Sequence, residues 1–254
     1  MNPILSAFNI RKEFGGLVAV DNVTLDIYEG RIQSLIGPNG AGKTTIFNLI
    51  TGFSPLTSGK IHFCSKRIDG KKPYRLVFMG IARTFQNVLL FGNMTVLENV
   101  MVGRHCRSRC SMISSALRFP WVFKEEREIR DNAMDQLKFV GLEKRAGEQA
   151  GSLPFGEQRV LEIARALATE PKLILLDEPA AGLNTHETEN LAGLIQQIKE
   201  KGVTVFLVEH DMSLVMDISD HIMVLNYGEK IAEGTPREIQ NDPLVIGAYL
   251  GEEL

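Results

Sequence analysis

One short run near residue 40 combines the residue types that bind phosphate, and it reads Gly37-Pro38-Asn39-Gly40-Ala41-Gly42-Lys43-Thr44. It fits the G-x-x-x-x-G-K-[ST] pattern, in which backbone N–H groups surround the phosphates of a nucleotide. The lysine of this pattern reaches the β- and γ-phosphates, and the hydroxyl that follows it ligates Mg²⁺. Glycine is needed because a Cβ would block the close approach of backbone to phosphate. The run predicts a nucleoside triphosphate site that uses Mg²⁺.

The elements on either side of this run are those that the phosphate site requires. Residues 31–36, half of them apolar, predict a short buried strand, and residues 45–50 predict the first turns of a helix. A helix N-terminus after a glycine-rich loop offers unpaired N–H groups and the positive end of the helix dipole to an anion. We therefore count Thr45, at the start of the predicted helix, among the nucleotide-binding residues.

A pair of carboxylates follows a second predicted strand. The apolar run of residues 173–176 ends in Asp177 and Glu178. A buried strand can deliver Asp177 beside the phosphate loop, where it would hold Mg²⁺ through water. Glu178, one residue further, is placed to polarise the water that attacks the γ-phosphate. Together with Lys43, these residues indicate hydrolysis of a nucleotide, whereas the phosphate loop alone leaves GTPases, kinases and transport ATPases open.

Composition narrows the class of protein. The chain has 254 residues, of which 44% are hydrophobic and 23% charged, and its net charge is −3. This balance is ordinary for a globular protein and gives no reason to expect a nucleic-acid partner. No apolar run approaches the roughly 18 residues that span a bilayer, and no signal peptide is recognisable at the start. We expect a protein of the cytosol, with reduced thiols at Cys64, Cys106 and Cys110, and we interpret His105 beside Cys106 as incidental rather than metal-binding.

The first half of the chain predicts strands and then helices. Apolar and polar residues alternate over residues 1–35, which indicates antiparallel strands with breaks at two glycine-containing turns. Residues 59–68 predict another strand, and residues 74–79 a helix. Residues 95–141 are helical in pattern, except for a basic, serine-rich stretch at 103–120 that we interpret as a loop before Trp121.

The second half alternates strands and helices. Such βα alternation indicates a largely parallel sheet with helices on both faces. The expected helices span residues 158–168, 187–199 and 212–219, and the expected strands span residues 173–176, 204–208 and 221–225.

The order of these elements resembles the nucleotide-binding subunit of ABC transporters over essentially the whole chain. The resemblance implies an α/β fold with a P-loop NTPase core, a mostly parallel sheet, an N-terminal antiparallel β subdomain and a helical subdomain at about 90–160. It implies that Gln86 is the Q-loop residue, which contacts Mg²⁺ and the transmembrane partner. His210 corresponds to the switch histidine that bonds the γ-phosphate, and Phe14 to the aromatic that stacks on adenine. Residues 181–184 correspond to the D-loop, which crosses the dimer interface.

One motif departs from the family pattern. Where the family has L-S-G-G-Q, this chain reads Leu153-Pro154-Phe155-Gly156-Glu157, followed by Gln158. The resemblance implies that residues 154–158 face the nucleotide of a second subunit. Proline suits a first helical position, so the helix N-terminus should persist, but the serine hydroxyl is lost and Glu157 adds repulsion toward phosphate. We therefore predict an asymmetric pair, in which this chain's own phosphate loop hydrolyses ATP against a partner's complete signature.

Several further stretches narrow the resemblance to one subfamily. Residues 14–20, 83–87, 209–216 and 234–251 resemble the larger ATP-binding subunit of branched-chain amino acid importers. That resemblance implies two permease subunits, a second ATP-binding subunit, an extracytoplasmic binding protein, and a position on the cytoplasmic side of the membrane. Urea or amide importers and the lipopolysaccharide-export ATPase share much of the tail. A soluble ABC ATPase of DNA repair or translation lacks support, because no coiled-coil insertion, second cassette or basic surface is visible. A regulatory subunit without hydrolysis would have no need of Glu178.

Overall fold

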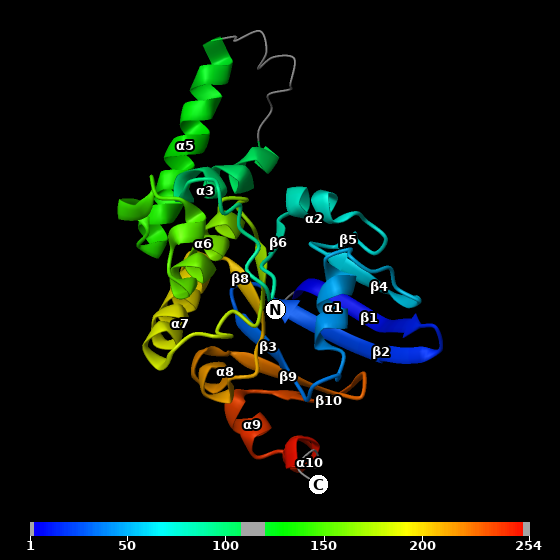
Figure 1. Ribbon diagram of the computed structural model, residues 1–254. Helices are drawn as coiled ribbons and strands as arrows, with labels where there is room; N and C mark the ends of the chain where they lie inside the picture. Colours follow the sequence, from blue (N-terminus) through cyan, green and yellow to red (C-terminus); the bar gives the residue numbers. More distant parts are fainter. Residues whose placement is uncertain (1–2, 108–119, 251–254) are drawn as a thin grey trace.

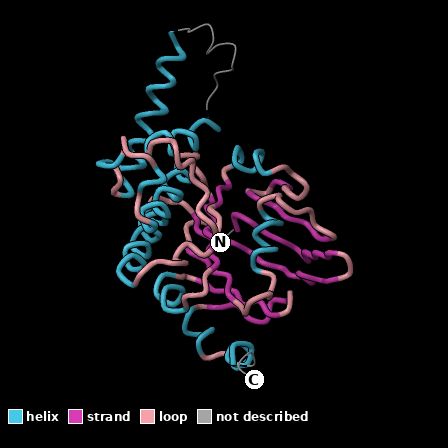
Figure 2. The backbone as a smooth tube through the Cα atoms, in the orientation of Figure 1, coloured by secondary structure: helices cyan, strands magenta, loops and turns pink. Residues whose placement is uncertain are grey.

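Two β-sheets of different type meet across helix α1 (Lys43–Ile50), and a group of helices stands beside them (Figure 1). The computed structural model describes residues 3–107 and 120–250. Figure 2 shows the strands gathered together, with most helices on one side of them. Buried side chains of both sheets and of α1 form one hydrophobic cluster, so the phosphate loop before α1 sits on a rigid base.

The first sheet is antiparallel and comes from the N-terminal part of the chain. Its order is β2 (Leu17–Tyr28), β1 (Pro3–Phe14), β4 (Ser58–Phe63) and β5 (Lys66–Arg67). Alternate residues of β2 are buried, as expected for a strand with one face on the core. The two glycines at residues 15 and 16 form the β1–β2 turn with φ of 52° and 97°, a conformation that favours glycine.

The second sheet is parallel except at one of its two edge strands. Its order is β10 (Glu229–Gly234), β9 (His221–Asn226), β3 (Ile32–Ile36), β8 (Thr204–Val208), β7 (Leu173–Asp177) and β6 (Ile81–Arg83). Only β10 pairs antiparallel, with β9. Every residue of β3, β7 and β8 is buried, which fits the apolar side chains at most of their positions; the buried polar exceptions are Gln33, Ser34, Asp177 and Thr204. Because β3, β6, β7 and β8 run parallel, their carboxyl ends lie at the same edge of the sheet.

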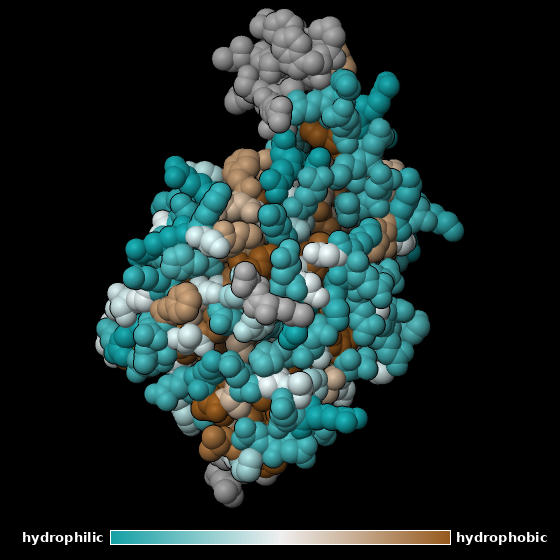
Figure 3. Space-filling view, turned by 180° about the vertical axis from the view of Figure 1, so that it is seen from behind, coloured by the Kyte–Doolittle hydropathy of each residue, from teal (hydrophilic) through white to brown (hydrophobic). Residues whose placement is uncertain are grey.

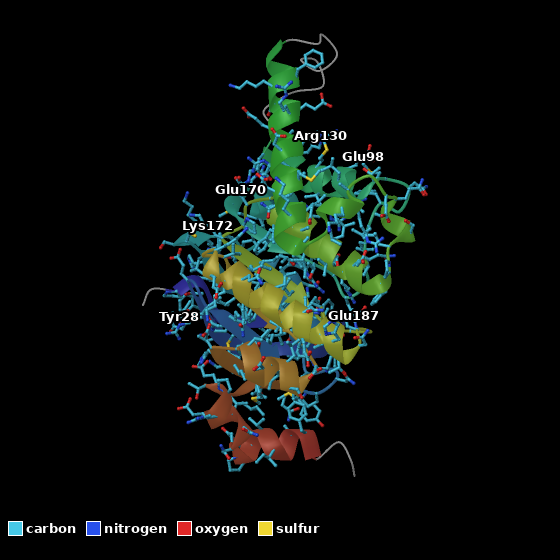
Figure 4. The ribbon with its side chains drawn as sticks, turned by 90° about the vertical axis from the view of Figure 1, so that its left-hand side faces the viewer. Tyr28, Glu98, Arg130, Glu170, Lys172 and Glu187 are labelled. Carbon is cyan, nitrogen blue, oxygen red and sulfur yellow. The ribbon has the colours of Figure 1, made fainter. Side chains whose placement is uncertain are left out.

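Helices α6 (Phe155–Leu167), α7 (Thr185–Glu200) and α8 (Met212–Ile218) pack on the second sheet in another cluster. Helices α3 (Val96–Arg104) and α5 (Pro120–Val140) pack against α6 in a third cluster, and Figure 4 shows them with Glu98 and Arg130 labelled. Short elements complete the fold. They are α2 (Pro73–Met79), α9 (Pro236–Gln240), α10 (Pro243–Leu250) and 3₁₀ turns at His105–Arg107, Glu143–Arg145 and Ala150–Ser152.

The face of the molecule drawn in Figure 3 is mostly hydrophilic. Figure 3 shows hydrophobic side chains in limited patches, one of them at the end where α10 lies, and Leu244 and Ile246 of α10 are exposed. Within residues 3–107 and 120–250, no helix combines the length and hydropathy that crossing a bilayer requires. Cys64 and Cys106 are free thiols, as predicted, whereas Cys110 lies outside the described residues.

The sequence-based elements are largely confirmed, with five corrections. The strand predicted at 59–68 is a hairpin, because Cys64 and Ser65 have φ of 47° and 62° and turn the chain between β4 and β5. Residues 32–35 belong to the parallel sheet rather than to the antiparallel strands. The loop predicted to reach residue 120 ends earlier, since α5 begins at Pro120, while residues 108–119 and the side chain of Trp121 lie outside the described residues.

Two further corrections concern helices and strands. Helix α6 begins at Phe155, three residues before its predicted start, so Pro154 is the N-cap and not the first helical residue. Four elements were not predicted: β6, β10, α9 and α10. Strand β6 has only three residues and owes its existence to pairing with β7, which a local pattern cannot reveal.

Candidate functional site

Segments far apart in the chain meet in one polar cleft of about 300 Å³. The cleft lies where the phosphate loop and the carboxyl ends of β7 and β8 come together. Most of the predicted site residues line it. The lining residues are Ala19, Asn39, Gly40, Ala41, Gly42, Lys43, Thr44, Thr45, Gln86, Glu178 and His210.

The phosphate loop is shaped by close backbone contacts. Gly42 has a φ of 104°, and a Cβ there would lie 2.5 Å from the carbonyl oxygen of Ala19. A Cβ at Gly37 would collide with the carbonyl of Leu225. The Lys43 amine is buried and donates to the carbonyl oxygens of Gly37 at 2.6 Å and Pro38 at 2.8 Å. The loop therefore curls around the Lys43 amine, which is held by two of the loop's own carbonyl oxygens.

Replacing Gly42 by alanine should damage this loop. An L-residue at this φ is strained by about 1–2 kcal/mol, and the new Cβ would push Ala19 away. We expect Gly42→Ala to lower the free energy of unfolding by about 2 kcal/mol and to weaken ATP binding at least tenfold. Chemical denaturation and titration with a fluorescent ATP analogue measure the two effects.

The matched control is Gly193→Ala in α7, where a Cβ would meet no atom within 4 Å. We expect this control to be neutral or to stabilise by about 0.5–1 kcal/mol, since alanine is the better helix former. Wild-type ATP affinity in Gly42→Ala would contradict the proposed role of the close contact.

Glu178 lies at the centre of the cleft between two other predicted residues. Its carboxylate accepts a hydrogen bond from Nε2 of Gln86 at 2.8 Å and contacts Nε2 of His210 at 2.9 Å. The side chain is 15% exposed, so water reaches it but does not surround it. Its φ of 48° is unusual for glutamate, and its N–H donates to Val208 at 2.8 Å. The backbone thus turns sharply at the end of β7 and directs Glu178 into the cleft.

Asp177 is directed away from the cleft surface and is paired with an arginine. Arg83 Nη2 donates to its carboxylate at 2.8 Å, and the two side chains are only 6% and 4% exposed. Arg83 also donates to the side chains of Asn48 and Thr51 at 2.8 and 3.0 Å. The phenyl rings of three residues surround the guanidinium, with centroids 5.0–5.7 Å away: Phe47, Phe53 and Phe85. Strand β7, strand β6 and α1 are thereby joined beneath the site.

The segment that carries Gln86 is held from behind by α6. Arg159, which is buried, donates to the carbonyl oxygen of Phe85 at 2.9 Å and also to that of Gln86. Glu162 accepts from the Phe85 N–H at 3.4 Å, and burial raises the pKa of its carboxyl. Helix α6 therefore fixes the backbone of the segment, while the Gln86 side chain reaches forward to Glu178.

The donor set in the cleft fits a nucleotide and a hard cation. The described residues contain no cluster of three or more His, Cys, Asp or Glu side chains that could hold a metal. A cation in the cleft would meet the Thr44 hydroxyl and the Gln86 amide oxygen, together with phosphate oxygens, whereas the Asp177 carboxylate is held by Arg83 and does not line the cleft. Few protein ligands, all of them oxygen, together with substrate phosphates are what Mg²⁺ prefers.

The structure does not bring all predicted residues to the cleft. Phe14 is 49% exposed, does not line the cleft, and lies under the Lys12 amine at 4.7 Å. The residues at 154–158 are on a different surface. Gly156 and Glu157 line a second cleft of about 580 Å³ with α5 and α7, and Gly156 packs against Glu187, labelled in Figure 4.

The segment at 154–158 has its own local contacts. Gln158 donates to the carbonyl oxygen of Leu153 at 2.9 Å, and the exposed ring of Phe155 lies over Arg159 at 5.4 Å. Glu157 pairs with Arg145 at 2.7 Å, which offsets the repulsion that its carboxylate would exert on phosphate. The lost serine hydroxyl thus remains the larger departure from the family pattern.

Comparison with known proteins establishes the family. The sequence profile of the ABC transporter family matches residues 20–181, which include the phosphate loop, Gln86 and Glu178. The chain belongs to the ABC transporter family. It is an ABC-type ATPase. A second profile, described as branched-chain amino acid ATP-binding cassette transporter, matches residues 229–254 of the cassette.

Relatives cover nearly the whole cassette. It is 47% identical over 251 residues to the high-affinity branched-chain amino acid transport ATP-binding protein LivG of Escherichia coli, covering 98% of both chains. BraF of Pseudomonas aeruginosa, which carries the same description, is also 47% identical with the same coverage. The probable LivG of Methanocaldococcus jannaschii is 38% identical over 253 residues, again covering 98% of each chain.

Solved structures agree with the fold. An ATP-binding cassette of an ABC transporter in its ADP conformation superposes with a TM-score of 0.87 and 36% identity, covering 99% of this cassette and 100% of that chain. A dimeric cassette in a post-hydrolysis state, bound to ADP and phosphate, has a TM-score of 0.77 and 29% identity, covering 92% and 99%. The predicted fold class, a P-loop NTPase core with a mostly parallel sheet, is confirmed.

Two residues that support the site escaped the sequence analysis. Arg83 is a charged residue at the end of an apolar strand, three positions before Gln86, and that placement was a usable signal. Arg159 lies among charged residues after Gly156, and nothing local distinguishes it from a surface arginine. Only the packing of α6 against the Gln86 segment reveals its role.

Proposed function

We propose that this chain is the ATP-hydrolysing subunit that powers an importer of branched-chain amino acids. The observation that carries the proposal is the Glu178 carboxylate in the phosphate-loop cleft, with Gln86 and His210 at 2.8 and 2.9 Å. The family membership supports ATP as the nucleotide. The relatives of 47% identity, named for branched-chain amino acid transport, support the transported substrate.

Each residue of the cleft has a role in this reaction. Lys43 and the loop N–H groups bind the β- and γ-phosphates, and Phe14 stacks on adenine. Thr44 and Gln86 would hold Mg²⁺, with Asp177 reaching it through water, and the cation would neutralise charge on the phosphates. Glu178 accepts the proton of the attacking water, whose oxygen bonds to the γ-phosphorus as the bond to the ADP oxygen breaks. His210, held against Glu178, bonds the γ-phosphate and thereby senses its presence.

A second ATP-binding subunit completes the site. In this chain residues 154–158 lie on a different surface from the phosphate loop, so the trans contact to the γ-phosphate must come from another chain. We infer a single cassette, 1–254, whose helical subdomain at about 90–160 contacts two permease subunits. The assembly sits on the cytoplasmic side of the membrane and receives substrate from an extracytoplasmic binding protein. ATP favours the closed pair, because only that state makes both sets of contacts.

The pair is asymmetric in this proposal. Pro154, the N-cap of α6, stands where the family has serine. Because proline has no hydroxyl, it cannot donate a hydrogen bond to the partner's nucleotide. This chain's own site keeps Glu178 and His210. The site that hydrolyses ATP is therefore the one formed by this phosphate loop and the partner's signature.

Purification from membranes and uptake measurements test the proposal. We expect the tagged full chain to copurify with two permeases and a second cassette, and to support ATP-dependent uptake of leucine, isoleucine and valine. Uptake of urea or a short amide, export of lipopolysaccharide, or recovery of DNA or ribosomes without a permease would each contradict it.

A further inference from the structure

Glu209 is a buried carboxylate beside the site, and it has no role in the reaction proposed above. It follows β8 directly and is 3% exposed. One carboxylate oxygen accepts from the N–H of Ala180 at 2.6 Å, and the other accepts from the N–H of His210 at 3.0 Å. The Asp211 N–H approaches the second oxygen at 3.5 Å. Glu209 therefore binds backbone on two different loops.

These loops carry the two reactive side chains. Strands β7 and β8 pair in parallel until Asp177 lies opposite Val208, and the N–H of Glu178 still donates to Val208. Beyond that point the chain turns at Glu178, and Pro179 has no N–H to continue the pairing. The Glu209 side chain then supplies the acceptor for Ala180. It extends the attachment of the two strand ends past the place where backbone pairing stops.

The group is costly to bury, which argues for a specific role. Burial raises the pKa of the Glu209 carboxyl, the proximity of Glu178 raises it further, and the backbone N–H groups oppose both effects. Glutamine has a similar shape but only one acceptor oxygen, so it could accept a hydrogen bond from only one of the two N–H groups. A carboxylate alone offers two acceptor oxygens with no donor between them.

We propose that Glu209 is a positioning residue that sets the distance between Glu178 and His210 and anchors the start of the segment at 180–184. The inference rests on the proposed hydrolysis of ATP at this site. Glu209 touches neither nucleotide nor water in this role. It acts through the backbone of Ala180 and His210, so it should influence the chemical step and not the binding of ATP at the phosphate loop.

Glu209→Gln tests this role, since the amide keeps the shape but turns one acceptor into a donor that faces an N–H. We expect kcat for ATP hydrolysis by the full chain in its membrane assembly to fall 10- to 100-fold. The Kd for a fluorescent ATP analogue should stay within twofold of wild type. In the background of Glu209→Gln, His210→Ala should lower kcat less than twofold further, because the histidine has already lost its position. The control Glu200→Gln, on an exposed side chain at the end of α7, should change neither kcat nor Kd.

Two results would overturn the inference in a wild-type protein that hydrolyses ATP: a kcat within twofold of wild type in Glu209→Gln, or additive effects of the two substitutions. If Glu209→Gln does not fold, Glu209→Asp keeps the charge on a side chain one methylene shorter, which cannot span both N–H groups. Glu209→Asp should show the same fall in kcat at unchanged Kd, and wild-type kcat would again overturn the inference. Absence of hydrolysis in the wild type would instead contradict the proposed function.

Discussion

Replacing Glu178 by glutamine is expected to lower the ATPase activity of the assembled transporter at least 100-fold, while ATP still binds. Glutamine keeps the size of the side chain and one acceptor for the bonds to Gln86 and His210. What it removes is the charge that accepts a proton from water, and such a base contributes about 10²–10⁴-fold to rate. A 100-fold loss corresponds to about 2.7 kcal/mol of transition-state stabilisation.

The measurement is steady-state phosphate release by the membrane assembly, together with the Kd of a fluorescent ATP analogue. Glu200→Gln, which removes an exposed carboxylate at the end of α7, is the matched control and should behave as wild type. Because the proposed pair hydrolyses ATP at this chain's own phosphate loop, the loss should occur even with an intact partner cassette. Activity near that of the wild type would show that the partner's site carries the turnover, and both the role of Glu178 and the asymmetry would be wrong.

The second large effect is on stability. Arg83→Met fills most of the arginine's volume among the three phenyl rings but leaves the Asp177 carboxylate without its cation at 4% exposure. Breaking a buried ion pair by removing one partner costs about 3–5 kcal/mol. We expect a loss of this size in the free energy of unfolding, measured by chemical denaturation.

The double variant Arg83→Met with Asp177→Asn separates charge from packing. Removing the charge together with its partner should recover about half or more of the lost stability, since no unpaired carboxylate remains. If Arg83→Met alone costs less than about 1 kcal/mol, Asp177 has another source of stabilisation in the folded state, and the pair is not what holds β6 to β7. ATP hydrolysis is not expected to return in the double variant, because Asp177 is a proposed metal ligand.

Local patterns were sufficient for most of the elements around the site. The strand, glycine loop and helix at residues 32–50 were predictable, because a buried strand and a helix start differ in apolar period and the loop glycines mark the turn. The strand that ends at Asp177 was predictable for the same reason. The short strand β6 and the C-terminal elements were not, because they owe their stability to neighbours distant in the chain.

The positions of the Phe14 ring and of residues 154–158 illustrate a different limit. Motif position assigned both to a nucleotide, yet neither lies in the cleft of this single chain. For residues 154–158 the family pattern already required a second subunit, and their place on another surface is compatible with that requirement. For Phe14, half-exposed beside Lys12, stacking on adenine remains a prediction.

The sequence by itself determined the chemistry of this protein: a phosphate loop, a strand-end carboxylate pair, and residues typical of an ABC cassette. Spacing along the chain was enough, because each motif is built on one strand end or helix start. The tertiary structure decided which side chains act together. Gln86 and Glu178 are 92 residues apart and meet only because β6, β7 and β8 are neighbours in the sheet. The supports from Arg83, Arg159 and Glu209 likewise depend on strand order and helix packing, which no local pattern records.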